Sequence, residues 1–195
     1  VRAALTTLSD ISPEAALLLG EGLSWYRDTG SMLAYQPGEG EFILGQLRRA
    51  SASHPRAYFY IGDYAARNAI DKIDPKLEGR IVRGLTAYED GARQGDGDCL
   101  ARLGQFASAV QLDASVAEVL PASVGERIRG LGDPMELLTE AADTGSPLAE
   151  YLYADYVSKV PAEVRGLAES PVRTRALDCA KRSLSRGFPD CHEII

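Results

Sequence analysis

The chain has 195 residues, of which 45% are hydrophobic and 25% charged, and these are the proportions of an ordinary globular protein with one domain or two small ones. Its 28 acidic residues outnumber the 21 Lys and Arg, and a formal charge of -7 argues against binding to a nucleic-acid backbone, which requires clustered basic side chains. No apolar run approaches the roughly 20 residues that a membrane-spanning helix needs.

An internal repeat organises the chain. Five short motifs begin near residues 12, 54, 96, 146 and 188, and each has Pro or Gly at its second position, at 13, 55, 97, 147 and 189. The preceding residue is polar in four of them and Phe188 in the fifth. Ser or Asp before Pro is typical of a helix start, because the side chain caps the first turn and Pro lacks an N–H that would stay unpaired there. The sequence therefore predicts five helices, here called A helices, at steps of 42, 42, 50 and 42 residues.

The A helices share one apolar face. Two residues after each Pro or Gly stands a small residue: Ala15, Ala57, Cys99, Ala149 and Cys191. A larger apolar residue follows four positions later, and then Gly or Ala in four of the units, as at Gly62 and Gly104. Positions i, i+4 and i+7 lie on one side of a helix. We therefore expect close helix packing at these positions.

A second set of helices, the B helices, precedes the openings. A partial one covers Val1–Leu8, and later ones start at Asp74-Pro75, Asp133-Pro134 and Ser170-Pro171. Three end at Gly95, Gly145 and Gly187, which suit the left-handed residue after a helix. Turns of two or three residues then lead into the next A helix, which predicts antiparallel hairpins. The longest A-to-B link, residues 111–132, contains a possible capping box at Ser123–Glu126.

These patterns predict an all-α protein, organised as a single domain over residues 1–195. We expect about four antiparallel helix pairs stacked as a right-handed α-α superhelix, or solenoid. Both chain ends fall within predicted helices. This predicts further repeats in a longer parent chain, self-association, or a partner against an open end.

The repeat resembles a known family. Leu137–Tyr151 is similar to the Sel1-like repeat, a tetratricopeptide-like α-solenoid unit, and so is Gly91–Gly95 followed by Leu103-Gly104. The A-to-B links are longer than in that family. The resemblance implies an adaptor that binds other proteins, in bacteria often an exported one with a role in envelope assembly, secretion, signalling or toxin immunity. It implies no catalytic residues, because the family shares none.

The three cysteines are expected to be structural. Cys99 and Cys191 occupy the small-residue position of the A helices, which predicts burial. A disulfide between Cys179 and Cys191 is disfavoured, since their predicted levels along the hairpin differ by roughly 6 Å at 1.5 Å rise per residue. With two His, and with no Cys-x-x-Cys motif, the sequence predicts neither a metal nor a cofactor. His54 is expected in a helix cap or turn.

Exposed aromatic and charged residues on the A helices form the candidate binding site. Tyr and Arg are favoured as anchors of protein interfaces. In helical solenoids the A helices line the concave surface, so we predict a concave binding stripe composed of Tyr60, Asp63, Arg67, Arg102, Gln105, Tyr151 and Asp155.

The expected function is therefore a non-enzymatic scaffold or adaptor for another protein, in a bacterial envelope or secretion-related process. A periplasmic or otherwise exported location is favoured over the cytoplasm by the resemblance. The alternative is an immunity protein that neutralises a secreted bacterial toxin, since an acidic surface suits a basic effector. A catalytic domain is disfavoured because no set of nucleophile, base and orienting residue emerges.

Overall fold

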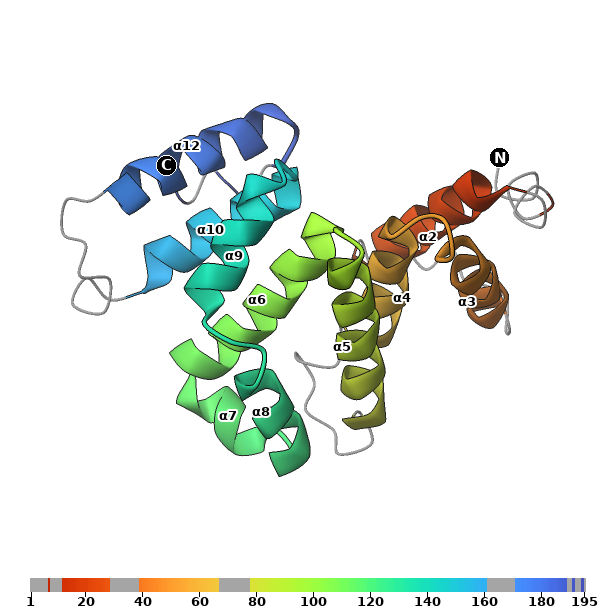
Figure 1. Cartoon of the computed structure of the whole chain (residues 1–195), viewed down its shortest axis with the longest axis horizontal. Coiled ribbons are helices and arrows are strands. Elements are labelled where there is room, and N and C mark those ends of the chain that lie inside the picture. The colour runs from red at the N-terminus through yellow and green to blue at the C-terminus, as the bar shows by residue number, and fades with distance from the viewer. Residues whose placement is uncertain are drawn as a thin grey trace. The chain divides into compact units, whose positions relative to one another are not determined.

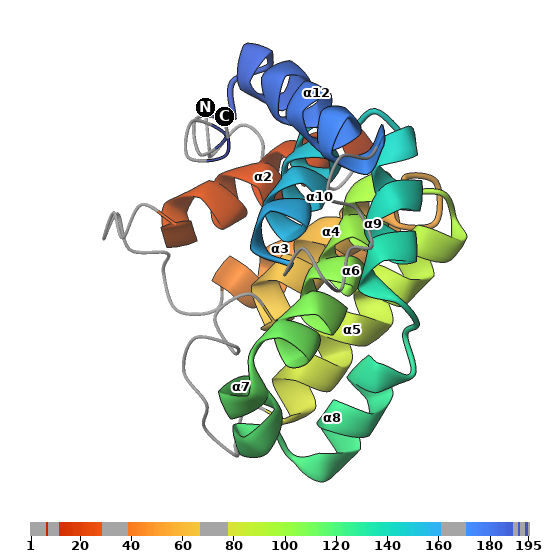
Figure 2. The same ribbon diagram turned by 90° about the vertical axis from the view of Figure 1, so that its left-hand side faces the viewer.

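The structure is a computed structural model that describes residues 12–28, 39–66, 78–160 and 171–188, together with Thr7, Cys191 and Ile194. In this part of the chain the regular secondary structure comprises ten α-helices and no strand, which confirms the predicted all-α class (Figures 1 and 2). Contacts divide the chain into two compact units, residues 1–99 and 100–195. The solenoid arrangement and its handedness stay predictions.

The first unit packs four helices and the start of a fifth. These are α2 (Pro13–Asp28), α3 (Glu39–Ala50), α4 (Arg56–Ala66), α5 (Glu78–Arg93) and the first residues of α6 (Gly97–Leu112). Helix α4 is central, because it contacts α2, α3 and α5, and α2 also packs against α3. The predicted hairpin of a B helix with the following A helix is thus present as α3 and α4.

The second unit contains the rest of α6 and five further helices. These are α7 (Ala114–Val119), α8 (Ala122–Arg129), α9 (Pro134–Asp143), α10 (Pro147–Lys159) and α12 (Pro171–Ser185). Helix α10 contacts both α9 and α12, as Figure 1 shows. The short helices α7 and α8 fill the long link between α6 and α9.

The predicted starts of the A helices are confirmed where the structure describes them. Helices α2 and α10 begin at the prolines of their motifs, and α6 begins at Gly97. The side chains of Ser12, Asp96 and Ser146 accept hydrogen bonds from backbone N–H groups three residues later, at 3.3, 2.8 and 3.5 Å. Helix α4 begins one residue after its Pro, at Arg56, and the His54 carbonyl accepts the Ala57 N–H at 3.0 Å. His54 therefore lies in the turn that leads into α4, as predicted.

The predicted helix ends are confirmed as well. Gly95, Gly145 and Gly187 have φ angles of 89°, 74° and 95°, in the region that disfavours residues with a Cβ. A fourth glycine, Gly132, has φ of 110° and precedes the residue that caps α9.

The small residues of the A helices lie in the core. Ala15, Ala57, Cys99, Ala149 and Cys191 are all buried. Glycines allow the helices to approach closely: an added Cβ on Gly104 would lie 2.7 Å from Leu138 Cγ, and one on Gly84 would lie 3.2 Å from Ala66 Cα. The repeat pattern therefore predicted packing positions correctly in both units.

One local prediction was wrong, and several lie outside the described residues. Helix α8 begins at Ala122 with Pro121 as its N-cap, so Ser123 lies inside the first turn and does not cap the helix. The Val1–Leu8 helix (Thr7 apart), the start at Asp74-Pro75 and most of the fifth A helix fall outside the described residues. Among the described helices, none is both long and apolar enough to cross a membrane.

Candidate functional site

The predicted stripe residues of the first unit have unequal exposure. Tyr60 is half-buried on α4, where its ring meets Phe59 edge to face at 5.5 Å between centroids. The Arg56 guanidinium lies 5.5 Å from the Tyr60 ring centroid, within cation–π range. Burial raises the pKa of the Tyr60 hydroxyl, so it stays a neutral donor and acceptor. Arg67 lies outside the described residues.

Asp63 does not belong to an exposed surface. Its exposed fraction is 2%, and its Oδ1 accepts a hydrogen bond of 2.6 Å from the Tyr88 hydroxyl of α5. A buried carboxylate needs such a donor, because burial without one costs several kcal/mol. The prediction that Asp63 contacts a partner is therefore corrected: the residue connects α4 to α5.

In the second unit, the predicted residues take part in local contacts. Arg102 is 9% exposed and donates from Nη1 to Gln105 Oε1 at 2.7 Å, so its guanidinium is directed along α6. Half-buried Tyr151 stacks on Phe188 with 5.7 Å between ring centroids. Asp155 pairs with Lys159 at 2.7 Å. Gln105, Tyr151 and Asp155 keep partial exposure, and their membership of one continuous stripe stays a prediction.

An ion pair with a buried carboxylate joins α10 to α12, and sequence reasoning missed it. Glu150 is 2% exposed, and its Oε1 accepts from Arg182 Nε at 2.6 Å, while Arg186 Nη1 lies 3.6 Å from its Oε2. The hydrogen bond to Glu150 raises the pKa of Arg182. No local signal indicates this pair, because its members are 32 residues apart.

The cysteines are packing residues, as predicted. Cys99, Cys179 and Cys191 are buried and free, so the disfavoured disulfide is not formed. Burial raises the pKa of the Cys99 and Cys179 thiols. A thiol with a raised pKa is a poor nucleophile at neutral pH, since the thiolate is the reactive form.

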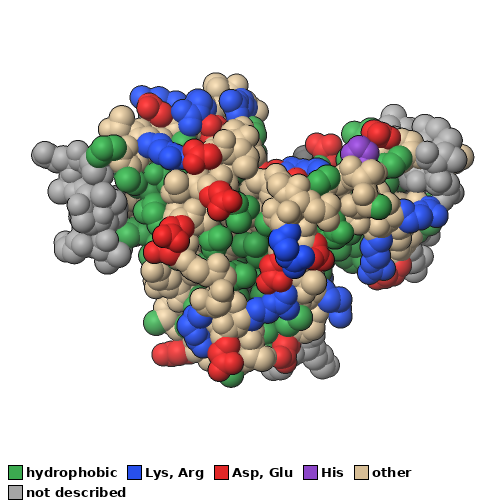
Figure 3. All heavy atoms as spheres, viewed as in Figure 1, with side chains coloured by type: hydrophobic (Ala, Val, Ile, Leu, Met, Phe, Trp, Pro, Cys, Tyr) green, Lys and Arg blue, Asp and Glu red, His purple; other side chains and the backbone are tan. Residues whose placement is uncertain are grey.

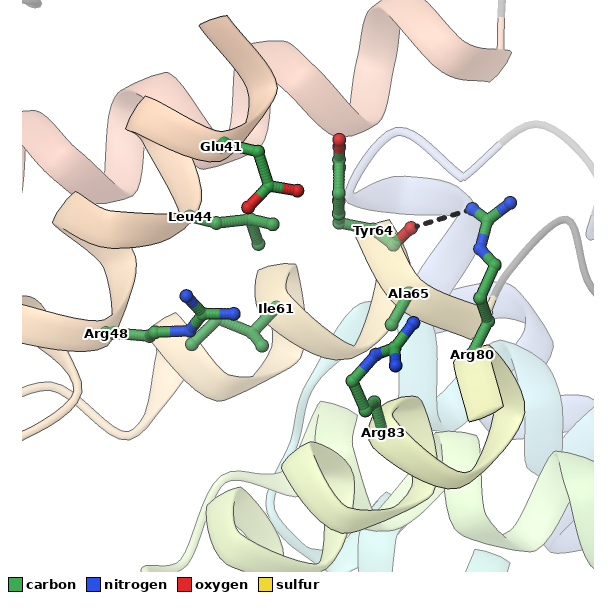
Figure 4. Close-up of a pocket in the computed structure, with 8 residues that line it drawn as sticks. All are labelled: Glu41, Leu44, Arg48, Ile61, Tyr64, Ala65, Arg80 and Arg83. Carbon is green, nitrogen blue, oxygen red and sulfur yellow. Dashed lines mark hydrogen bonds between the residues drawn. The ribbon is translucent and has the colours of Figure 1, made fainter. Parts of the chain in front are cut away.

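An open cleft lies on the first unit. Its volume is about 540 Å³, and it lies among α3, α4 and α5 (Figure 4). The lining residues are Glu41, Leu44 and Arg48 of α3, Ile61, Tyr64 and Ala65 of α4, and Arg80 and Arg83 of α5. Among the described lining residues, three thus carry guanidinium groups and one, Glu41, carries a carboxylate.

The cleft arginines form no ion pair with a carboxylate within the described residues. Arg48 and Arg83 are exposed, and half-buried Arg80 donates to the Tyr64 carbonyl oxygen at 3.4 Å. By contrast, Arg56 in the same unit pairs with Asp98. On the face drawn in Figure 3, basic and acidic side chains are largely interspersed. Among the described residues, the cleft is therefore a local concentration of positive charge.

The sequence carried no signal for this cleft. Arg48 lies on one predicted B helix, and Arg80 and Arg83 lie on the next, with no motif that relates them. A smaller cleft of about 210 Å³ lies on the second unit, and Arg173 is the one charged residue among its described lining residues. No group of three or more His, Cys, Asp and Glu that suits a metal ion occurs among the described residues.

Comparisons with known proteins find no match among protein-family models, curated proteins or solved structures. The resemblance to the Sel1-like repeat thus depends on the residues quoted for it and stays a prediction.

Proposed function

We propose that this chain is a non-enzymatic scaffold that binds a protein partner through the surfaces of its helical hairpins. The observation that carries the proposal is that helices recur in phase with the sequence repeat, and that a small residue, Ala or Cys, is buried at the same position of each repeat. Stacked helical hairpins with this organisation form extended binding surfaces in repeat proteins.

The distribution of side chains supports this proposal. Potentially reactive groups are used for packing: Asp63 accepts from Tyr88, and the Cys99 thiol has a raised pKa. Meanwhile Tyr60 and Tyr151, on two different A helices, retain partly exposed rings. Tyr rings supply large contact areas at low entropic cost and are frequent anchors in interfaces.

The cellular setting follows from the family resemblance alone. Proteins similar to the Sel1-like repeat family serve in bacterial envelope and secretion-related processes, and we extend that setting to this chain as part of the proposal. If the partner proves to be a secreted toxin, the same scaffold acts as an immunity protein.

The test identifies the partner and then measures direct binding. The tagged chain is used to capture partners from native cells, mass spectrometry identifies them, and the purified pair is titrated calorimetrically. We expect Tyr60→Ala and Tyr151→Ala each to weaken binding by about tenfold, which corresponds to about 1.4 kcal/mol.

A matched control separates binding from folding. Val119→Ala truncates an exposed apolar side chain on α7, outside the predicted A helices, and is expected to leave affinity unchanged. Circular dichroism and thermal unfolding confirm that each variant is folded. If both Tyr variants are folded and bind the partner with unchanged affinity, the predicted stripe is contradicted. If none of the captured proteins binds the purified chain directly, the scaffold function is contradicted.

A further inference from the structure

We infer that the cleft among α3, α4 and α5 binds an acidic segment of a partner protein, whose Asp or Glu side chains pair with Arg48, Arg80 and Arg83. This inference rests on the proposed scaffold function and specifies the chemistry of its partner. It also adds a binding surface that is separate from the predicted tyrosine stripe.

The geometry of the cleft suits more than one ligand group. Figure 4 shows the Arg48 side chain entering from α3 and the Arg80 and Arg83 side chains entering from α5, with α4 between them. The volume of about 540 Å³ is within the range of roughly 300–1,000 Å³ that is typical of ligand sites. A short stretch of extended or helical chain therefore fits better than a single carboxylate.

The charge of the cleft selects an anionic partner. Among the described lining residues, three arginines and Glu41 give a formal charge of about +2, whereas the whole chain carries -7. A guanidinium binds a carboxylate through two parallel hydrogen bonds, and it is less strongly hydrated than a lysine ammonium. Because Arg48 and Arg83 have no carboxylate partner within the described residues, an incoming acidic side chain displaces no internal ion pair.

The apolar part of the cleft favours a peptide over a simple anion. Leu44, Ile61 and Ala65 line the cleft beside the guanidinium groups. An inorganic phosphate would leave this apolar surface in water, whereas an apolar side chain next to an acidic one would cover it at roughly 25 cal/mol per Å². Nucleic acid is disfavoured by the excess of negative charge over the rest of the chain.

The test uses the intact purified chain and three probes. The first is a short fluorescent peptide of alternating Glu and Leu, the second is the same peptide with Gln in place of Glu, and the third is inorganic phosphate. Binding is followed by fluorescence anisotropy for the peptides and by NMR shifts of the arginine Nε–Hε groups for all three. We expect the Glu peptide to bind at least about tenfold more tightly than the Gln peptide, and its affinity to fall as salt screens the charges.

Substitutions then locate the site. Arg48→Gln and Arg83→Gln remove exposed guanidinium groups and should each weaken the Glu peptide by about two- to fivefold. Arg80→Gln removes a half-buried group and should cost about tenfold or more. Arg129→Gln is the matched control, because Arg129 is exposed on α8, does not line the cleft, and changes the net charge equally.

The outcomes distinguish this inference from the scaffold proposal. Since Arg83 is exposed and makes no ion pair or side-chain hydrogen bond among the described residues, Arg83→Gln tests binding with little risk to folding. Equal binding of the two peptides, equal losses in Arg83→Gln and Arg129→Gln, or phosphate affinity equal to that of the Glu peptide would each overturn the acidic-peptide site. If a native partner binds the Arg48, Arg80 and Arg83 variants normally but does not bind Tyr60→Ala, the cleft is not its binding site, whereas the scaffold function is retained.

Discussion

Gly62 offers the sharpest test of how the sequence repeat controls helix packing. An ideal Cβ at this position of α4 would lie 2.6 Å from Tyr88 Cδ1 and 2.7 Å from Tyr88 Cζ. The Tyr88 ring is fully buried, and its hydroxyl donates to Asp63 at 2.6 Å, so it has no free space in which to rotate. Gly62→Ala must therefore separate α4 from α5 or displace this ring.

The expected cost follows from three contributions. Overpacking of a well-filled core costs about 1–3 kcal/mol, and loss or distortion of the Tyr88–Asp63 hydrogen bond costs about 1 kcal/mol more. Alanine is favoured over glycine inside a helix by about 1 kcal/mol, which offsets part of this. We expect Gly62→Ala to lower the free energy of unfolding by about 1–3 kcal/mol.

Gly45→Ala on α3 is the matched control, because nothing lies within 4 Å of its added Cβ. The same substitution should here raise stability by about 0.5–1 kcal/mol. Urea unfolding followed by circular dichroism and by the single Trp, Trp25 of α2, reports both effects. A Gly62→Ala variant as stable as the wild type, or a destabilised Gly45→Ala variant, would refute the packing argument.

Three further results are expected from the buried polar groups and thiols. Tyr88→Phe removes the donor to the Asp63 carboxylate and should lower stability by about 1–3 kcal/mol in urea unfolding. Arg182→Met leaves the buried Glu150 carboxylate with Arg186 alone, at 3.6 Å, and should lower the free energy of unfolding by about 2–3 kcal/mol. This is less than the roughly 3–5 kcal/mol that breaking a fully buried ion pair costs, because Arg182 is half-exposed. Burial raises the pKa of the Cys99 thiol in the folded protein. As the pH rises above about 8.5, this thiol is therefore deprotonated in the unfolded chain before it is in the folded one, and the free energy of unfolding falls. We expect this fall to be smaller in Cys99→Ala, as measured by urea unfolding across that pH range.

Local patterns in the sequence were sufficient to predict six of the ten described helix starts, three helix ends and several packing positions. A cap such as Ser146, a Pro at the first helical position and a left-handed Gly act within four residues of one another, so their effect is visible without the tertiary structure. Burial of Cys99 and Ala149 followed from their shared position in the repeat. The false capping box at Ser123 shows the weakness of this reasoning, because a single local motif is less specific than a repeated one.

The polar contacts could not be predicted, since each depends on residues from different helices. Asp63 was expected on the surface because a carboxylate is rarely buried, and its donor Tyr88 is 25 residues away. The cleft arginines meet only because α3 and α5 both pack on α4. In each case the chemistry of the side chain was evident from the sequence, whereas its partners and its exposure required the packed structure.

Gly145 separates backbone conformation from packing, because its φ is 74° and nothing lies within 4 Å of its added Cβ. A left-handed conformation costs a residue with a Cβ about 1–2 kcal/mol, and reduced freedom of the unfolded chain returns about 0.4–1 kcal/mol. Gly145→Ala should thus lower stability by about 1 kcal/mol, and Gly145→Asn should cost less than Ala because Asn tolerates this conformation. Urea unfolding of the two variants side by side measures the difference. Equal costs for Ala and Asn would mean that α9 does not end through the left-handed conformation of Gly145.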